Sequence, residues 1–370
     1  MRILISGARA PVALEWAAIC MSHGHDVILT DSLRKPLGSF LRGINGYVCT
    51  ASPRLNFPAY RQHVLELITT YQIEMIIPTC EEVYYLAQIA EQAPDVNFFL
   101  PNKALLYALH NKFTVFGQLQ GLPEISIPET HLITDMDHVQ SCGNTILKPV
   151  YSRFGGQVIR DVNKPTLSDI VISTNMPWVQ QEKITGTPVC NYGIFEHGIL
   201  KAHQAYLPKS CINGSAASAF QPIEHARIKT FMAAFGLRHH FHGQVSFDFI
   251  ESGKHIYVIE CNPRATSGLH IIASQCTQLS PNIEFTTQTK NKLHHLGPVS
   301  LVAEGVSSLI ETGTWRDWWN GVNVMTRHRL QFGGQLLSLL ELCYLAKQAN
   351  GNWSAASTFD IEWNGEELTS

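Results

Sequence analysis

Residues 248–264 read Asp248-Phe-Ile-Glu-Ser-Gly-Lys-His-Ile-Tyr-Val-Ile-Glu260-Cys-Asn262-Pro-Arg264, and this stretch decides the expected fold. Apolar residues flank a Glu-Ser-Gly turn, which predicts a β-hairpin. Asp248 belongs to the first strand, whereas Glu260 and Asn262 lie two apart on the second strand and share one face. Three oxygen-bearing side chains would converge there, as suits Mg²⁺ carrying nucleotide phosphates. Arg264 would then contact a phosphate or carboxylate bidentately. An ordinary hairpin with a polar edge fits the same residues.

The composition narrows the class of protein. The 370 residues exceed one typical compact domain, and 45% hydrophobic with 15% charged residues allow a sizeable core. A net charge of −3 without a basic tract gives no indication of nucleic-acid binding. Nine scattered cysteines are typical of reduced thiols, and no apolar run reaches membrane-spanning length. We therefore expect a cytoplasmic protein of two or three domains that binds neither nucleic acid nor membranes.

Strand and helix patterns alternate over residues 1–100. Such βα units predict an open parallel sheet with helices on both faces. Ligands of these sheets bind beyond the carboxyl ends of the strands, where residues 6–10 and 79–82 form loops. Ordinary βα turns with an N-cap would look the same. The expected strands are 2–6, 26–30, 75–78 and 97–100, and the expected helices are 12–23, 60–71 and 82–92.

The middle of the chain has a different pattern. Residues 145–149 predict a strand that ends in Lys148 and Pro149, and Gly155-Gly156 follow in a loop. Glycines let backbone N–H groups approach phosphates, and Lys148 would add a point charge, although a plain hairpin fits equally well. From residue 178 onward, strand patterns with one helix predict an antiparallel-rich α+β region.

Four signatures in order resemble those of the ATP-grasp superfamily, over roughly residues 1–290. They are an asparagine–lysine pair before a helix, a lysine strand with a glycine loop, a hinge and the hairpin. Their order and spacing make the resemblance strong, although each is weak alone. The most similar group is the carboxylate–amine ligases, related to carbamoyl-phosphate synthase large chain, biotin carboxylase and D-alanine–D-alanine ligase. The signatures are Asn111-Lys112-Phe113 with residues 121–130, Lys148-Pro149 with Gly155-Gly156, residues 181–186 and residues 248–264.

The resemblance implies an α/β N-terminal open parallel sheet, a Rossmann-like pre-ATP-grasp domain, followed by a two-lobed α+β ATP-grasp fold. The implied domains are 1–102 and 103–290, with a small lobe over about 113–180 and a catalytic lobe over about 181–290. Residues 291–370 match no motif, and this C-terminal extension would pack on the core, cap the pocket or form a homodimer interface. Trp315, Trp318 and Trp319 fit packing or an interface better than catalysis.

The resemblance also implies roles for individual residues. Catalysis would involve Arg264, Lys148 and Lys201. ATP would be held by Lys112, Lys148, Gly155, Gly156, Glu182, Lys183, Ile184 and Lys201. Mg²⁺ or Mn²⁺ would be held by Asp248, Glu260 and Asn262. The substrate would contact Arg9, Glu81, Arg264, Thr266, Ser267, Gly268 and His270.

The implied activity is that of a ligase. ATP would phosphorylate a small-molecule carboxylate, and an amine would attack the acyl phosphate to give an amide, ADP and phosphate. A thiol or bicarbonate acceptor, simple phosphorylation of an acid, and non-catalytic ATP binding stay open as alternatives. In one departure, Thr187-Pro188-Val189 stands where many members place a ribose-binding carboxylate, so ribose contact must come from elsewhere. The substrates and the general base are not identifiable, because function resides in the variable pocket.

Overall fold

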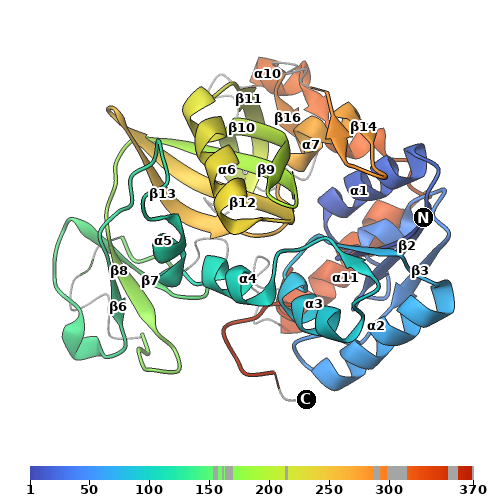
Figure 1. Cartoon of the computed structure of the whole chain (residues 1–370), viewed down its shortest axis with the longest axis horizontal. Coiled ribbons are helices and arrows are strands. Elements are labelled where there is room, and N and C mark those ends of the chain that lie inside the picture. The colour runs from blue at the N-terminus through green and yellow to red at the C-terminus, as the bar shows by residue number, and fades with distance from the viewer. Residues whose placement is uncertain are drawn as a thin grey trace.

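The computed structural model describes residues 1–152, 157–160, 162, 170–212, 216–286, 292–297, 315–348 and 357–368. Figure 1 shows a five-stranded sheet region at one end of the molecule and a small three-stranded sheet at the other. A seven-stranded sheet lies between them. Helix α4 (Lys103–His110) leads from the first region toward the small sheet.

The N-terminal region is a parallel sheet of order β3-β2-β1-β4-β5. Its strands alternate with helices in the expected βα order, and β3 is an additional edge strand that the pattern did not predict. The strand order reverses between β1 and β4, so the carboxyl ends of these two strands meet at the position where ligands of such sheets bind. The elements are β1 (Arg2–Ser6), α1 (Pro11–Ser22), β2 (Asp26–Asp31), η1 (Leu37–Phe40), β3 (Gly46–Cys49), α2 (Phe57–Tyr71), β4 (Met75–Pro78), α3 (Val83–Ile89), η2 (Ala90–Gln92) and β5 (Asn97–Phe98).

Helices cover both faces of this sheet. Ile3 and Ile5 of β1 are buried in one core cluster with residues of α1. Leu4, which points to the opposite face, is buried in a second cluster with residues of α2 and α3. Because successive strand residues face opposite sides, a continuous apolar run such as Ile3–Leu4–Ile5 is what a doubly covered sheet requires.

The small sheet is antiparallel, with the order β6-β8-β7. Ile133, Leu147, Val162 and Trp178 form its own small core. Lys148 lies near the end of strand β7 that faces the rest of the molecule. Just beyond this end, the carbonyl oxygen of Val150 accepts a hydrogen bond from the amide of Lys112, which follows α4. The elements are α5 (Thr114–Leu119), β6 (Thr130–Ile133), η3 (Met136–His138), β7 (Thr145–Pro149) and β8 (Trp178–Glu182).

The large sheet has the order β13-β12-β9-β10-β11-β16-β17. Helix α6 packs Phe231 and Phe235 against Phe195 and Phe247 of the sheet, with aromatic rings about 5–6 Å apart and mostly edge to face. This core supports the β12–β13 hairpin from behind. The elements are β9 (Thr187–Glu196), β10 (Ile199–Ile212), β11 (Ala216–Ile223), α6 (Ala226–His239), β12 (Gly243–Ser252), β13 (His255–Asn262), α7 (Leu269–Ile272), η5 (Ala273–Gln275), β14 (Cys276–Gln278) and β15 (Glu284–Phe285).

Residues beyond 290 continue the large sheet. Strand β16 (His294–His295) pairs with β11, and β17 (Val322–Asn323) pairs with β16. Trp318 of α10 (Trp315–Trp319) packs its ring 4.3 Å from that of His295. The extension thus packs on the core, one of the expected alternatives, and a boundary at 290 cuts through a sheet. The chain continues through η6 (Val324–Arg327) and α11 (Gly334–Gln348). Within the described part of the chain, no helix combines the length and apolarity needed to cross a membrane.

Candidate active site

The β12–β13 hairpin places its three oxygen-bearing residues as the alternation predicts. Asp248 lies directly opposite Glu260, and Ser246 lies opposite Asn262. The Nδ2 atom of Asn262 donates a hydrogen bond to Oδ2 of Asp248 at 3.3 Å, so these side chains share one face. The convergence follows from strand geometry alone, since every second side chain of a strand points to the same side.

Two buried lysines approach this face from different elements. Lys112 follows α4, and its Nζ atom lies 3.3 Å from Oε1 of Glu260 and donates to the carbonyl oxygen of Ser152 at 2.7 Å. Lys148 is on β7, and its Nζ atom donates to the carbonyl oxygen of Ile259 at 3.1 Å. The small and large sheets therefore meet at a common group of charges. We call this group the lysine–carboxylate cluster: Lys112, Lys148, Asp248, Glu260 and Asn262.

Burial disfavours the charged forms of two members of the lysine–carboxylate cluster. Burial lowers the pKa of Lys148 to about 8, although the carboxylate of Glu260 works in the opposite direction. Burial, together with repulsion from Glu260, raises the pKa of Asp248 to about 6. A divalent cation beside the carboxylates and a phosphate beside Lys148 would each favour the charged form. The donor set, which consists of carboxylate and amide oxygens, therefore fits Mg²⁺ bound together with a nucleotide.

Gln181 orients Lys148, a role that the sequence motifs do not indicate. Its Oε1 atom accepts a hydrogen bond from Nζ of Lys148 at 2.9 Å, and its Nε2 atom donates to Thr130 Oγ1 at 3.0 Å. The side chain is buried, and buried amides are normally hydrogen-bonded in this way. The pairing of the two strands would have predicted this contact, because Gln181 on β8 lies diagonally across from Lys148 on β7.

Arg264 connects the hairpin to the N-terminal sheet. Its Nε atom donates to Oε1 of Glu81 at 2.8 Å, and a terminal nitrogen donates to Oδ1 of Asn262 at 3.2 Å. Glu81 lies in the loop after β4, at the carboxyl end of the sheet, and is buried. Burial opposes the charge of the guanidinium, but Glu81 more than offsets it, so the pKa of Arg264 is raised above its usual value. Two of the expected substrate residues thus lie together beside the lysine–carboxylate cluster.

The hinge between β8 and β9 is held by its backbone. The amide of Glu182 donates to the carbonyl oxygen of Glu129 at 2.8 Å, and the amide of Lys183 donates to that of Asn144 at 2.7 Å. Glu182 and Lys183 are exposed and Ile184 is partly exposed, so the hinge is accessible. Adenine binding there stays a prediction. The glycines expected to hold phosphates, Gly155 and Gly156, lie outside the described residues.

Lys201 lies away from the lysine–carboxylate cluster. Its Nζ atom is 3.0 Å from Oε2 of Glu196, at the turn between β9 and β10. Asp248 is opposite Cys190, and Glu196 lies six residues further along β9, which corresponds to about 20 Å of strand. The length of β9 thus separates Lys201 from the lysine–carboxylate cluster in this structure, and its predicted contact with ATP stays a prediction.

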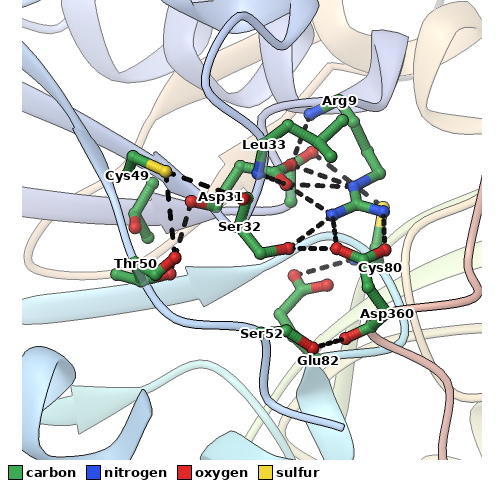
Figure 2. Close-up of polar contacts among 12 residues, drawn as sticks. Arg9, Asp31, Ser32, Leu33, Cys49, Thr50, Ser52, Cys80, Glu82 and Asp360 are labelled. Carbon is green, nitrogen blue, oxygen red and sulfur yellow. Dashed lines mark hydrogen bonds and ion pairs between the residues drawn. The ribbon is translucent and has the colours of Figure 1, made fainter. Parts of the chain in front are cut away.

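Arg9 forms ion pairs with two aspartates, Asp31 and Asp360, as Figure 2 shows. One terminal nitrogen donates to Asp31 at 2.6 Å and to Asp360 at 2.9 Å, and the other donates to Asp360 at 2.6 Å. Asp31 also accepts a hydrogen bond from the backbone amide of Arg9 at 2.8 Å. A substrate contact by Arg9 stays a prediction. We call Arg9, Asp31 and Asp360 the Arg9 cluster.

His270 is also enclosed by the fold. Its Nδ1 atom lies 2.8 Å from Oε1 of Glu15 on α1, and its carbonyl oxygen accepts from Arg327 at 2.8 Å. The residue is only 2% exposed. Hydrogen bonds to His270 and His328 overcome the effect of burial and lower the pKa of Glu15 to about 2. Three segments far apart in sequence thus close around this histidine, and its substrate contact stays a prediction.

The turn between β13 and α7 contains the remaining expected substrate residues, Thr266, Ser267 and Gly268. The hydroxyl of Ser267 donates to the carbonyl oxygen of Ala217 at 3.3 Å. A Cβ atom at Gly268 would lie 2.3 Å from Cβ of Tyr192, so only glycine allows this close approach. A substrate contact by these three residues stays a prediction.

Several solved structures share this fold. An L-amino acid ligase from Bacillus licheniformis superposes with a TM-score of 0.59 at 15% identity, over 75% of this chain and 72% of that one. An N5-carboxyaminoimidazole ribonucleotide synthetase from Thermotoga maritima gives 0.54 at 14% identity, over 75% and 72% of the chains. The biotin carboxylase domain dimer of the Hydrogenobacter thermophilus 2-oxoglutarate carboxylase, in complex with MgADP, ADP and bicarbonate, gives 0.56 at 13% identity, over 77% and 72%.

These similarities show that the chain shares the fold of these three enzymes. The identities of 13–15% are too low to transfer substrates or residue roles. No protein-family model matches the chain, and no curated protein matches its sequence significantly.

Proposed function

We propose that this protein is an ATP- and Mg²⁺-dependent ligase that joins a small-molecule carboxylate to an amine. The carboxylate oxygen would attack the γ-phosphorus of ATP and displace ADP, which gives an acyl phosphate. The amine nitrogen would then attack the acyl carbon, lose a proton and displace phosphate, which gives the amide. Overall, ATP, acid and amine become ADP, phosphate and amide.

The observation that carries the proposal is the convergence of Lys112 and Lys148 on the Asp248–Glu260 pair. Phosphoryl transfer needs little covalent work from the protein, and depends on positioning and charge neutralisation. Lys112 and Lys148 would neutralise the phosphates from two sides. Asp248, Glu260 and Asn262 would hold Mg²⁺, which would supply positive charge to stabilise the transferring phosphoryl group.

Arg264 is the candidate for the acid substrate. This cation lies beside the lysine–carboxylate cluster, where it donates hydrogen bonds to Asn262 and Glu81. Its planar guanidinium would pair bidentately with the substrate carboxylate or the acyl phosphate. Glu81, which already holds Arg264, fixes the orientation of the guanidinium and places the acid at the carboxyl end of the N-terminal sheet.

The test is ADP release with Mg²⁺ and ATP across amino acids and other small carboxylates, singly and in pairs with amines. Release that requires one acid–amine pair, and is reduced at least about a hundredfold in Glu260→Ala, is the expected result. Glu251→Ala is the matched control, because Glu251 lies on the same hairpin but pairs with His225, 2.8 Å away.

Other outcomes decide against parts of the proposal. ADP released with an acid alone would indicate a kinase, and a dependence on a thiol or bicarbonate would replace the amine. Failure of the wild-type protein to bind MgATP or MgADP would overturn the proposal as a whole.

A further inference from the structure

The C-terminal segment, residues 357–368, is anchored on the N-terminal sheet. Asp360 is buried and joins Arg9 through two hydrogen bonds of 2.6 and 2.9 Å. Glu362 pairs with Arg54, and its carbonyl oxygen accepts from the hydroxyl of Tyr85 at 2.7 Å. Figure 1 shows this segment, in red, passing below α3 and α4 on its way to the C-terminus. The contacts of Asp360 and Glu362 therefore fix the position of the next residue, Trp363.

Trp363 of this segment packs on α4, the helix that precedes Lys112. Its ring stacks on that of Tyr107 at 4.3 Å, and its carbonyl oxygen lies 3.0 Å from Nε2 of His110. The other ring nitrogen of His110 lies 2.8 Å from the hydroxyl of Tyr84. His110 is the last residue of α4, so Trp363 contacts the helix two residues before the lysine of the lysine–carboxylate cluster.

The same segment also contacts Tyr151, which follows β7. The rings of Trp363 and Tyr151 lie 5.5 Å apart, edge to face. Gly365 approaches so closely that a Cβ atom there would lie 2.5 Å from the Tyr151 ring. The hydroxyl of Tyr151 in turn accepts a hydrogen bond from the Asn111 side chain at 3.2 Å.

The packing of the C-terminal segment on α4 and its packing on Tyr151 both lead to Lys112. Its backbone amide donates to the carbonyl oxygen of Val150 at 3.2 Å, and its Nζ atom donates to that of Ser152 at 2.7 Å. Residues 110–112 and residues 150–152 therefore form one joint, with the C-terminal segment packed on both of its sides. In the sequence, residue 152 is followed three positions later by Gly155 and then Gly156.

We propose that the C-terminal segment is a positioning element for the phosphate end of the nucleotide site, with Trp363 and Gly365 as its positioning residues. This inference rests on the proposed nucleotide binding, and adds residues that lie about 250 positions from Lys112 in the chain. Lysine is a point charge on a flexible stem, so its effect on a phosphate depends on where its backbone is held. The segment holds that backbone by packing on His110 and Tyr151, whereas adenine is expected at the hinge.

The test compares ADP with adenosine, which lacks the phosphates. Binding of each, with Mg²⁺ present, is measured by calorimetry for the wild type, Trp363→Ala, Trp363→Phe and Gly365→Ala. We expect ADP affinity to fall about tenfold or more in Trp363→Ala and Gly365→Ala, as for a displaced charge-assisted contact, while adenosine affinity stays within about twofold. Trp363→Phe, which keeps an aromatic ring on Tyr107, should recover most of the ADP affinity.

Gly253→Ala is the matched control for Gly365→Ala. Both glycines have positive φ, +58° and +89°, so both variants strain the backbone, but a Cβ atom at Gly253 meets nothing within 4 Å. Unchanged ADP affinity in Trp363→Ala and Gly365→Ala would overturn this inference alone. Equal losses of ADP and adenosine would also overturn it, since they would indicate a general effect on folding. A wild type that binds no ADP would overturn the proposed function, and this inference with it.

Discussion

The Arg9 cluster and the lysine–carboxylate cluster both bury charged side chains, but only in the Arg9 cluster do the partners offset the cost of burying the charges. In the Arg9 cluster, burial is more than offset by the opposite charges, so the pKa of Arg9 is raised and that of Asp360 is lowered. In the lysine–carboxylate cluster the balance is reversed: burial lowers the pKa of Lys148 and raises that of Asp248. The protein stabilises the charged forms in one place and disfavours them in the other.

This difference in pKa shifts distinguishes a structural ion pair from a candidate binding site. A buried ion pair whose hydrogen bonds are all made holds segments together and has little to offer a ligand. A group of carboxylates and lysines whose charged forms are disfavoured by burial is stabilised by a ligand of opposite charge, here a cation and an anion together. The direction of the pKa shift, more than the presence of charge, therefore distinguishes the candidate site from the anchor.

The largest expected effect comes from breaking the Arg9 cluster. Arg9→Met leaves Asp31 and Asp360 buried without their cation, and we expect a loss of about 3–5 kcal/mol in the free energy of unfolding, measured with urea. The matched control is Arg54→Met, which breaks the partly exposed Arg54–Glu362 pair on the same C-terminal segment and should cost about 0–1 kcal/mol. Equal losses in the two variants would contradict the assignment of Arg9 as the main anchor.

The comparison is sharpened by two lysines that were predicted to bind the same nucleotide. Lys148→Met should weaken MgADP binding by about 10–100-fold, because it removes a buried charge beside the phosphates. Lys201→Met removes the same charge at the Glu196 turn and should leave the affinity within about twofold. Calorimetric titration of both variants measures the difference. A comparable loss in Lys201→Met would support the predicted contact of Lys201 with ATP.

The smallest effect is the pH dependence of metal binding. Asp248 has a pKa of about 6, so a proton competes with Mg²⁺ below that pH, and MgADP affinity should fall by up to about tenfold per pH unit between pH 6 and 5. Without ligand the sign is opposite for stability: the folded form holds this proton more tightly than the unfolded form, so stability falls as pH rises from about 4 through 6.

Asp248→Asn is the variant that checks the pH assignment. It removes the titrating group, so the remaining MgADP affinity should lose most of its slope between pH 5 and 6, as measured by titration at several pH values. A slope that persists in Asp248→Asn would assign the proton to another residue, such as Glu260.

The sequence predicted the local part of the site better than its long-range contacts. It placed Asp248, Glu260 and Asn262 together because they belong to one hairpin, and Lys112 and Lys148 followed from their order among the signatures. It did not reveal the partner of Arg9, because Asp360 is 351 residues away. It did not reveal the partner of His270 either, because Glu15 is 255 residues away.

The sequence by itself determined the elements and their faces. The apolar alternation of residues 248–264 determines that Asp248 and Glu260 project from the same side, because the two-residue period of a strand is a local property of the backbone. Likewise, the βα order of the first hundred residues determines a parallel sheet. Only the tertiary structure decided which buried charges find partners. Packing brings Asp360 to Arg9, and it buries Lys148 and Asp248 so deeply that the charged form of each is disfavoured. No local pattern contains these contacts, because they join segments far apart in the sequence.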